Sequence, residues 1–184
     1  MRSSPHSADG LLADYLPVGE TEVKDVARVR AMIASTPDPW SRDVPLHLTA
    51  SALIVHPETG RVLLRWHDRM GSWLQVGGHG DPGESDPLSV VLREGREETG
   101  LADLRPWPTG ELRHAVVVSV PGTPREPAHE HADLRFVLAT ATPDEASPEK
   151  PTTPLRWLSL PEALDLAAED NLRETLTRTR LLLA

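Results

Sequence analysis

The stretch that decides the fold is residues 77–101, GGHGDPGESDPLSVVLREGREETGL. Its second half predicts a helix of about four turns over residues 86–99. Asp86 is a good N-cap, Pro87 suits the first helical position, and Gly100 supplies the C-terminal stop. An apolar stripe runs along this helix at helical spacing: Leu88, Val91, Leu92, Gly95 and Thr99. We expect that stripe to pack on a β-sheet.

Three carboxylates of the same helix share one face. Glu94, Glu97 and Glu98 stand at i, i+3 and i+4, so their side chains project together. Like charges at this spacing repel one another, and a divalent cation relieves the repulsion. Ligands that are all oxygen favour Mg²⁺ or Mn²⁺ over zinc, and Mg²⁺ typically joins carboxylates to substrate phosphates. The helix therefore predicts a site for Mg²⁺ or Mn²⁺.

A glycine-rich loop, GGHGDPGE, comes directly before the helix. Its glycines at positions 77, 78, 80 and 83 let the backbone approach a ligand closely. Such loops and helix N-termini bind phosphate oxygens through free N–H groups. The loop and the carboxylate helix together indicate one substrate class, a phosphate compound that binds with a metal ion.

The hexamer REGREE, residues 93–98, has a plainer interpretation as a solvated helix in which Arg93 and Glu97 form an i,i+4 ion pair. For an arbitrary charged hexamer that interpretation is preferred. Here five fixed residue identities and one aliphatic position of a known motif, described below, occur together. Such agreement is expected by chance roughly once in 10⁴ chains of this length. The glycine loop beside the hexamer lowers those odds further, so a metal site is favoured.

This stretch resembles the box of the Nudix family, commonly written G x5 E x7 R E U x E E x G U, with U a bulky aliphatic residue. Matching identities stand at Gly78, Glu84, Arg93, Glu94, Glu97, Glu98, Gly100 and Leu101. Eight residues rather than seven separate Glu84 from Arg93, and Gly95 replaces the aliphatic residue. Counting forward from Gly78 therefore assigns the first glutamate position to Glu84, whereas counting back from Arg93 assigns it to Ser85.

The resemblance extends from residue 46 to the C-terminus and implies an α/β fold, the Nudix-type α/β/α sandwich with a central mixed β-sheet. It implies that Glu94, Glu97, Glu98 and the carbonyl of Gly78 bind the metal ion. It also implies catalytic roles for Glu94, Glu97 and Arg93, with Arg93 orienting a glutamate. Glu94 would bind metal or help to activate water.

The reaction implied is water attack on phosphorus in a phosphoanhydride, or pyrophosphate, bond. The substrate would be a nucleoside diphosphate linked to another moiety, or a related small molecule. The alternative is a catalytically weak or inactive nucleotide-binding or regulatory module on the same fold, since folds are reused for different functions.

The segment AHEHADLRF contributes candidates outside the box. The resemblance implies a further acid as base or ligand, for which Asp133 and Glu130 are the candidates. In a strand, side chains two residues apart share a face, and the face expected to line the pocket carries His129, His131, Asp133 and Arg135.

Substrate-binding candidates are spread over the loop, a strand and a hairpin: Gly77, His79, His131, Arg135 and Trp73. For His79 and His131 a solvated polar position is the simpler interpretation, and we do not predict either as a metal ligand. For Trp73, packing in the core or in a hairpin is the simpler alternative to stacking on a nucleobase.

Around the box the sequence predicts strands over residues 46–55, 61–67, 112–120, 133–141 and 156–158, and helices from Pro161 to the end. Residues 21–35 predict an N-terminal helix, preceded by a loosely held arm over residues 1–19. We divide the chain into an N-terminal arm, helix and linker, residues 1–45, and a Nudix hydrolase domain, residues 46–184. We expect the two to form one compact unit.

Composition narrows the function classes. The 184 residues contain no cysteine, which excludes a thiol nucleophile and a Cys-based zinc site. The formal charge of −9 opposes binding to polymeric nucleic acid or an anionic membrane. Neither a membrane span nor a secretory signal is visible, so we expect a cytoplasmic protein with a small-molecule partner. The oligomeric state stays open, a homodimer included.

Overall fold

The computed structural model describes residues 4, 6–124 and 126–183. Its strands are β1 (Leu46–His56), β2 (Arg61–His67), β3 (Ser72–Leu74), β4 (Val76–Gly78), β5 (Arg105–Pro106), β6 (His114–Val120), β7 (His129–Ala139) and β8 (Leu155–Ser159). Its helices are α1 (Ala8–Ala13), α2 (Gly19–Ser35), α3 (Pro87–Thr99), α4 (Leu160–Leu166), α5 (Asp170–Leu183) and the short 3-10 helix η1 (Pro143–Glu145).

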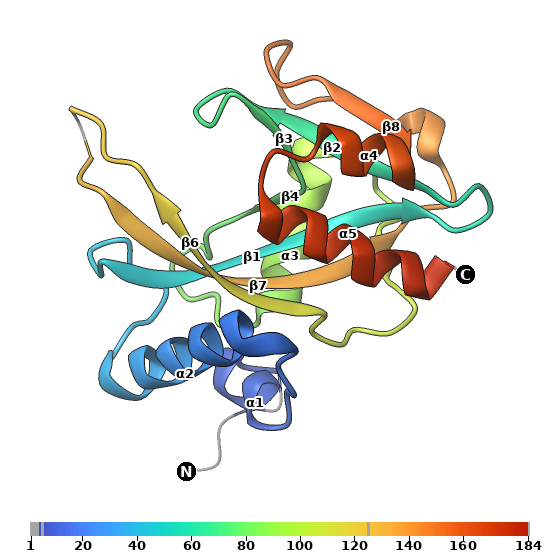
Figure 1. The fold of residues 1–184 in the computed structure, drawn as a ribbon. Helices are drawn as coiled ribbons and strands as arrows, with labels where there is room; N and C mark the ends of the chain where they lie inside the picture. Colours follow the sequence, from blue (N-terminus) through green and yellow to red (C-terminus); the bar gives the residue numbers. More distant parts are fainter. Residues whose placement is uncertain (1–3, 5, 125, 184) are drawn as a thin grey trace.

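The strands form a curled mixed sheet between layers of helices (Figure 1). The path through the sheet is β3-β2-β1-β7-β5, with β4 paired to β1, β6 to β7 and β8 to β2. Helix α3 covers one face, and α4 and α5 cover the other. This is the α/β/α arrangement predicted from the sequence, and the predicted fold class is confirmed.

Two apolar layers lie on opposite faces of the sheet, because successive side chains of a strand point to opposite sides. Between them, β1 pairs in parallel with β7, from Leu46 beside Glu130 to Val55 beside Ala139. The layer against α3 includes Leu48, Ala50, Ala52, Ile54, Val90, Val91, Leu134 and Phe136. The layer against α4 and α5 includes Leu53, Val55, Val62, Val137, Leu160, Leu172 and Leu176.

One face of β1 changes character along the strand. Its second half presents Leu53 and Val55 to the apolar layer under α4 and α5. Its first half presents the polar residues His47, Thr49 and Ser51 on the same side, by the alternation of the strand. The parallel register sets three residues of β7 beside them: His131, Asp133 and Arg135. This polar end of the sheet face is the part left for a functional site.

Helix α3 begins and ends as the sequence predicts. The side chain of Asp86 accepts a hydrogen bond from the backbone N–H of Leu88 at 3.0 Å, and Pro87 occupies the first turn. Gly100 closes the helix with a left-handed φ of 69°, a conformation that glycine adopts without steric cost.

The apolar stripe of α3 differs from the prediction in detail. Leu88 and Leu92 are only half-buried, whereas Val90, which the prediction left out, is fully buried. The contacts of α3 with β4 and β1 select the buried side, and helical spacing alone does not resolve that choice. Gly95 is buried as predicted, and a Cβ atom there would lie 2.9 Å from the side chain of Leu104. Leu104 therefore fills the space that an aliphatic side chain would need.

The N-terminal arm is more ordered than predicted. Residues 21–35 form a helix as predicted, with α2 beginning two residues earlier. The prediction of a loose arm over residues 1–19 is wrong for the described part, because α1 packs Leu12 completely and Ala8 almost completely into the core. Residues 1–3 and 5 of that prediction lie outside the described residues. A helix of six residues is too short to show a period in the sequence.

Helix α2 runs along β6 and satisfies backbone groups of that strand (Figure 1). The N–H groups of Ala115 and Val117 donate to the carboxylates of Glu22 and Asp25, each at 3.0 Å. These amides lie on the edge of β6 that faces away from β7, where unpaired N–H groups favour association with other strands. The two carboxylates therefore close that edge.

The other predicted strands are present, and β7 begins at residue 129, four residues before the predicted start. The long helical pattern at the C-terminus is divided between α4 and α5. Among the described residues, none of the helices combines the length and the apolar character required to traverse a bilayer.

Candidate active site

Arg93 of α3 is the centre of the polar cluster formed by the box. Its guanidinium donates to Glu84 at 2.8 Å and, through Nη1, to Glu94 and Glu97, each at 3.0 Å. It also donates to the backbone carbonyl of His79 at 2.9 Å. The bond to Glu84 is the largest cause that raises the pKa of Arg93, which is a permanent cation. The planar guanidinium group of Arg93 thus joins the glycine loop to two carboxylates of the helix.

The structure answers the register question at Glu84. Glu84, and not Ser85, contacts Arg93, and Ser85 is exposed. A tight turn aims Glu84 back at the helix: its carboxylate accepts from the N–H of Asp81 at 2.7 Å, and its own N–H donates to the carbonyl of Asp81 at 2.9 Å. The hydrogen bonds from Arg93 lower the pKa of Glu84. The additional residue lies between this turn and the N-cap Asp86.

Glu98 is the most buried carboxylate of the box, with 10% of its side chain exposed. It accepts a hydrogen bond from the N–H of Gly77 at 3.1 Å and lies 3.2 Å from the guanidinium of Arg65. Burial raises the pKa of Glu98 to about 7, against the opposing effects of Arg65 and the Gly77 amide. Burial also raises the pKa of Glu94. Both carboxyl groups would gain from a nearby cation when ionised.

The three glutamates do not converge on one point, although they share a helix face. Nη1 of Arg93 lies between Glu94 and Glu97, while Glu98 turns toward Arg65. The exposed fractions of the side chains differ accordingly, at 17% for Glu94, 55% for Glu97 and 10% for Glu98. Arg93 and Arg65 therefore neutralise the carboxylate charges whose repulsion we expected a divalent cation to relieve. The oxygen-only donor set, in which burial raises the pKa of Glu94 and Glu98, fits a hard divalent ion.

Gly78 lets the carboxylate of Glu94 lie directly on the backbone of β4. A Cβ atom at this position would come within 2.6 to 2.8 Å of the carboxylate atoms of Glu94. Any side chain at position 78 would therefore displace that carboxylate, and glycine is required for this close approach.

A cleft of about 240 Å³ opens on the polar sheet face beside the glycine loop. Gly77 and Gly78 connect this cleft to the carboxylates, because both glycines line the cleft and contact Glu98 and Glu94 respectively. The sequence-predicted residues that line it are Gly77, Gly78, His79, His131, Asp133 and Arg135. Most of the predicted binding residues thus meet in one place.

Asp133 and Arg135 are an internal ion pair below this cleft. Arg135 donates to Asp133 at 2.8 Å, and the same carboxylate accepts from Ser51 at 2.7 Å and from Thr49 at 3.0 Å. Burial alone would raise the pKa of Asp133, but Arg135 and these hydroxyl groups lower it. The rest of the Arg135 guanidinium is bonded to Asn171 and Thr175. Both groups are engaged in holding the strands and α5 together.

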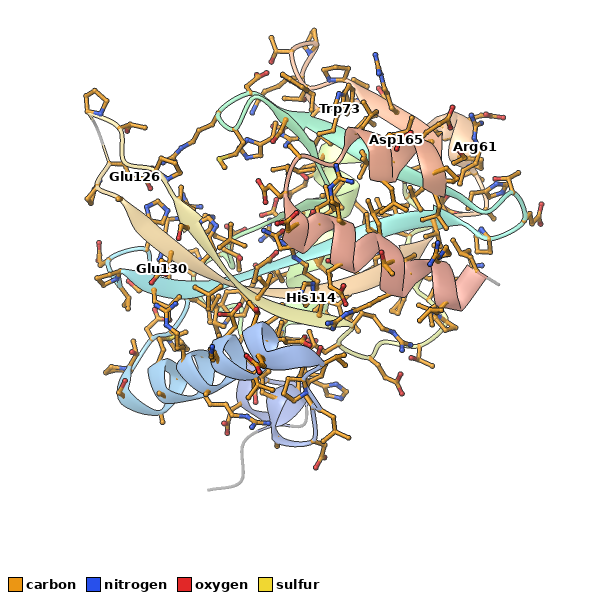
Figure 2. All side chains as sticks on the ribbon, viewed as in Figure 1. Arg61, Trp73, His114, Glu126, Glu130 and Asp165 are labelled. Atoms are coloured by element: carbon orange, nitrogen blue, oxygen red, sulfur yellow. The ribbon has the colours of Figure 1, made fainter. Side chains whose placement is uncertain are left out.

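The charged residues of the box do not line the cleft, and two predicted site residues from outside the box also lie apart from it (Figure 2). Glu130 points to the opposite face of β7 from His131 and binds Arg28 of α2 at 2.6 Å. Trp73 packs edge-on against Trp66 at a centroid distance of 5.6 Å and lies 4.7 Å from the guanidinium of Arg156. The hairpin alternative for Trp73 agrees with this packing.

Two residues of this region, Arg65 and His47, were not predicted from the sequence. Arg65 is the cation nearest to Glu98, and its Nε is buried without a hydrogen-bond partner. Nothing local distinguishes it from the other arginines. For His47 a signal was present, since His47, Thr49 and Ser51 form a polar period-2 pattern inside an otherwise apolar strand.

Replacing Arg93 by Lys is expected to lower kcat about 100-fold, because Lys keeps the charge but not the planar fork, and misplacement of catalytic groups by about 1 Å costs that much. The measurement is steady-state hydrolysis with the best substrate. Glu84→Gln, which keeps an acceptor for Arg93, is expected to lose less. Equal activity of Arg93→Lys and the wild type would show that the fork does not position the carboxylates.

Comparison with known proteins places these features in a family. The sequence model of the NUDIX domain matches residues 45–179, which is most of the chain and contains the whole box. No curated protein matches the sequence.

Several solved structures similar to this one are those of hydrolases. An Ap4A hydrolase from C. elegans matches with a TM-score of 0.58 and 19% identity, covering 74% of this chain and 98% of that one. The dihydroneopterin triphosphate pyrophosphohydrolase of E. coli matches with a TM-score of 0.55 and 20% identity, covering 71% and 92%. A NUDIX-family hydrolase from Clostridium perfringens matches with a TM-score of 0.53 and 22% identity, covering 74% and 97%. At these identities the likeness concerns the fold.

Proposed function

The chain belongs to the Nudix family and is a Nudix hydrolase, and from this premise we propose that it uses Mg²⁺ or Mn²⁺ to cleave a phosphoanhydride bond. The substrate we propose is a nucleoside diphosphate linked to another moiety, or a related small molecule. The observation that carries the proposal is the guanidinium of Arg93, which holds Glu84, Glu94 and Glu97 beside the glycine loop. An isolated surface helix would have no such link to a loop.

We assign the metal ion to Glu94, Glu97, Glu98 and the carbonyl of Gly78. When bound, the ion supplies positive charge to the phosphate oxygens of the substrate. Glu97 has the most accessible of the three carboxylates, so it is available to both the ion and the attacking water. Arg93 holds the loop carbonyl of His79 and the helix carboxylates at a constant separation. The backbone of Gly77 and Gly78 forms the wall that a diphosphate would meet in the cleft.

The substrate class draws support from two proteins of similar structure, the Ap4A hydrolase and the dihydroneopterin triphosphate pyrophosphohydrolase. Each of them suggests a test compound rather than the substrate of this chain. The cleft, at about 240 Å³, has room for only part of a nucleotide, so the remainder would extend over the rim.

The test is to incubate the protein with a panel of candidate substrates and to identify the products. The panel contains nucleotide sugars, dinucleotides, dinucleoside polyphosphates, oxidised nucleotides and non-nucleotide pyrophosphates. With Mg²⁺ or Mn²⁺ present, at least one member is expected to turn over. Exhaustive chelation is expected to abolish that turnover, and added Mg²⁺ to restore it, because the ion supplies positive charge to the phosphate oxygens of the substrate. Saturable nucleotide binding without turnover across the panel would overturn the proposal in favour of a regulatory module.

A further inference from the structure

Four histidine side chains meet at the end of the cleft. His47 comes from β1, His79 follows β4, and His129 and His131 begin β7. The ring centroids of His79 and His131 are 4.8 Å apart, those of His47 and His131 are 5.1 Å apart, and those of His129 and His131 are 5.0 Å apart. His47 and His131 are register partners in the parallel pair, so their side chains stand side by side on one face.

The ring nitrogens, and not only the rings, point at one another. Nε2 of His47 lies 3.1 Å from Nε2 of His79, and Nε2 of His129 lies 3.2 Å from Nε2 of His131. One nitrogen from each of His47, His79 and His131 lies within 4.8 Å of the other two. A tetrahedral ion with Zn–N bonds of about 2.0 to 2.1 Å needs its ligand nitrogens roughly 3.3 Å apart. The His47–His79 and His129–His131 nitrogen pairs already have about this spacing.

Backbone carbonyls fix the tautomers of two of these rings. Nδ1 of His47 lies 2.7 Å from the carbonyl of Val44, and Nδ1 of His129 lies 3.0 Å from the carbonyl of Pro127. A carbonyl oxygen only accepts, so each Nδ1 carries the proton and each Nε2 presents its lone pair to the cluster. Anchoring the remote nitrogen on a carbonyl is how metal-binding histidines are usually oriented.

Burial lowers the pKa of His131 to about 4 and also lowers the pKa of His47, so these two imidazoles are neutral at pH 7. Neutral imidazoles keep a lone pair for a metal ion. A buried group of neutral nitrogen donors suits zinc, copper, nickel or iron rather than Mg²⁺, Ca²⁺ or Mn²⁺.

We propose that His47, His79 and His131 form a binding site for a divalent transition metal ion of the zinc type, with His129 as a fourth ligand. The site is separate from the carboxylate centre and does not depend on the proposed hydrolysis. Its link to the box is His79, whose carbonyl is held by Arg93 while its side chain belongs to the cluster. A bound ion would therefore hold the glycine loop of the box against β1 and β7.

The experiment uses the full chain without a polyhistidine tag, stripped of metal and titrated with Zn²⁺ against a competing chromophore. One tight equivalent is expected, unaffected by excess Mg²⁺. Co²⁺ in its place is expected to give the visible absorption of a tetrahedral nitrogen site. His131→Gln and His79→Gln are expected to weaken Zn²⁺ binding at least tenfold, since losing even an outer partner of a ligand costs about 10- to 100-fold.

The matched control is His56→Gln, which changes a histidine at the other end of β1, bonded to Thr59, and is expected to bind Zn²⁺ like the wild type. Glu97→Gln is also expected to keep the tight equivalent, which separates this site from the box. His47 is almost fully buried, so its substitution can prevent folding. If His47→Gln fails to fold, the affinity of His79→Gln for Zn²⁺ provides the test, because His79 lies on the loop. Absence of a tight equivalent in the wild type, or equal affinity in His79→Gln and His131→Gln, would overturn the proposal.

Discussion

Glu97→Gln is expected to lower kcat about 1000-fold with the best substrate. The substitution keeps the size of the side chain but removes a negative charge that we assign to the metal ion. Positive charge on the reacting phosphates supplies several kcal/mol of transition-state stabilisation, and each 1.36 kcal/mol corresponds to a tenfold change in rate. The measurement is kcat and KM at saturating Mg²⁺, together with the apparent affinity for Mg²⁺.

The loss is expected to be specific, because Glu97 contributes little to the fold. Its side chain is 55% exposed and forms an i,i+4 pair with Arg93, so the free energy of unfolding is expected to change by less than about 1 kcal/mol. Glu174→Gln is the matched control. Glu174 is 47% exposed and pairs with Arg178 across the same helical spacing. Turnover close to that of the wild type in Glu97→Gln would remove Glu97 from the site.

Glu22→Gln is expected to lower the free energy of unfolding by about 3 kcal/mol at neutral pH. Glu22 of α2 is almost fully buried and accepts from Arg178 of α5 at 2.9 Å, from the hydroxyl of Tyr15, and from the N–H groups of Val18 and Ala115. Removing one partner of a buried pair costs about 3 to 5 kcal/mol, because the other charge remains uncompensated. Chemical denaturation of wild type and variant measures the difference.

The pH dependence provides a second readout of the same pair. Burial alone would raise the pKa of Glu22, but Arg178, Tyr15 and the two amides outweigh it and lower the pKa to about 2. A lowered carboxyl pKa gives stability that is present above about pH 4.5 and lost as the pH falls toward 2. The difference in unfolding free energy between Glu22→Gln and the wild type is therefore expected to shrink over that interval.

Glu22 also tests how residues 1–45 relate to residues 46–184. Because Glu22 joins α2 to α5 and to the edge of β6, we propose that the two parts unfold together, in a single transition in both the wild type and the variant. Asp25→Asn is the milder control, since Asp25 accepts one amide hydrogen bond, from Val117, and about 1 kcal/mol is expected. A separate early transition of the N-terminal helices would contradict the proposal.

The sequence by itself determined the parts of this protein that depend on neighbours along the chain. The cap at Asp86, the stop at Gly100 and the helix between them are local, so they were predicted correctly. The strands β1 and β2 and the alternation of β7 follow from patterns of neighbouring residues in the same way. Local rules also gave the carboxylate face of α3, because i, i+3 and i+4 spacing needs no tertiary contact.

Only the tertiary structure decided which groups meet across the sheet. Burial of Glu98 beside Arg65, and the contact of Glu84 with Arg93, depend on how the glycine loop returns over α3. The four histidines come from three segments that are far apart in the sequence, and the parallel register of β1 and β7 brings two of them together. Each strand shows its own polar pattern in the sequence, but which strand pairs with which is not visible there. For that reason the carboxylates of the box were visible in the sequence, whereas the histidine cluster appeared only in the fold.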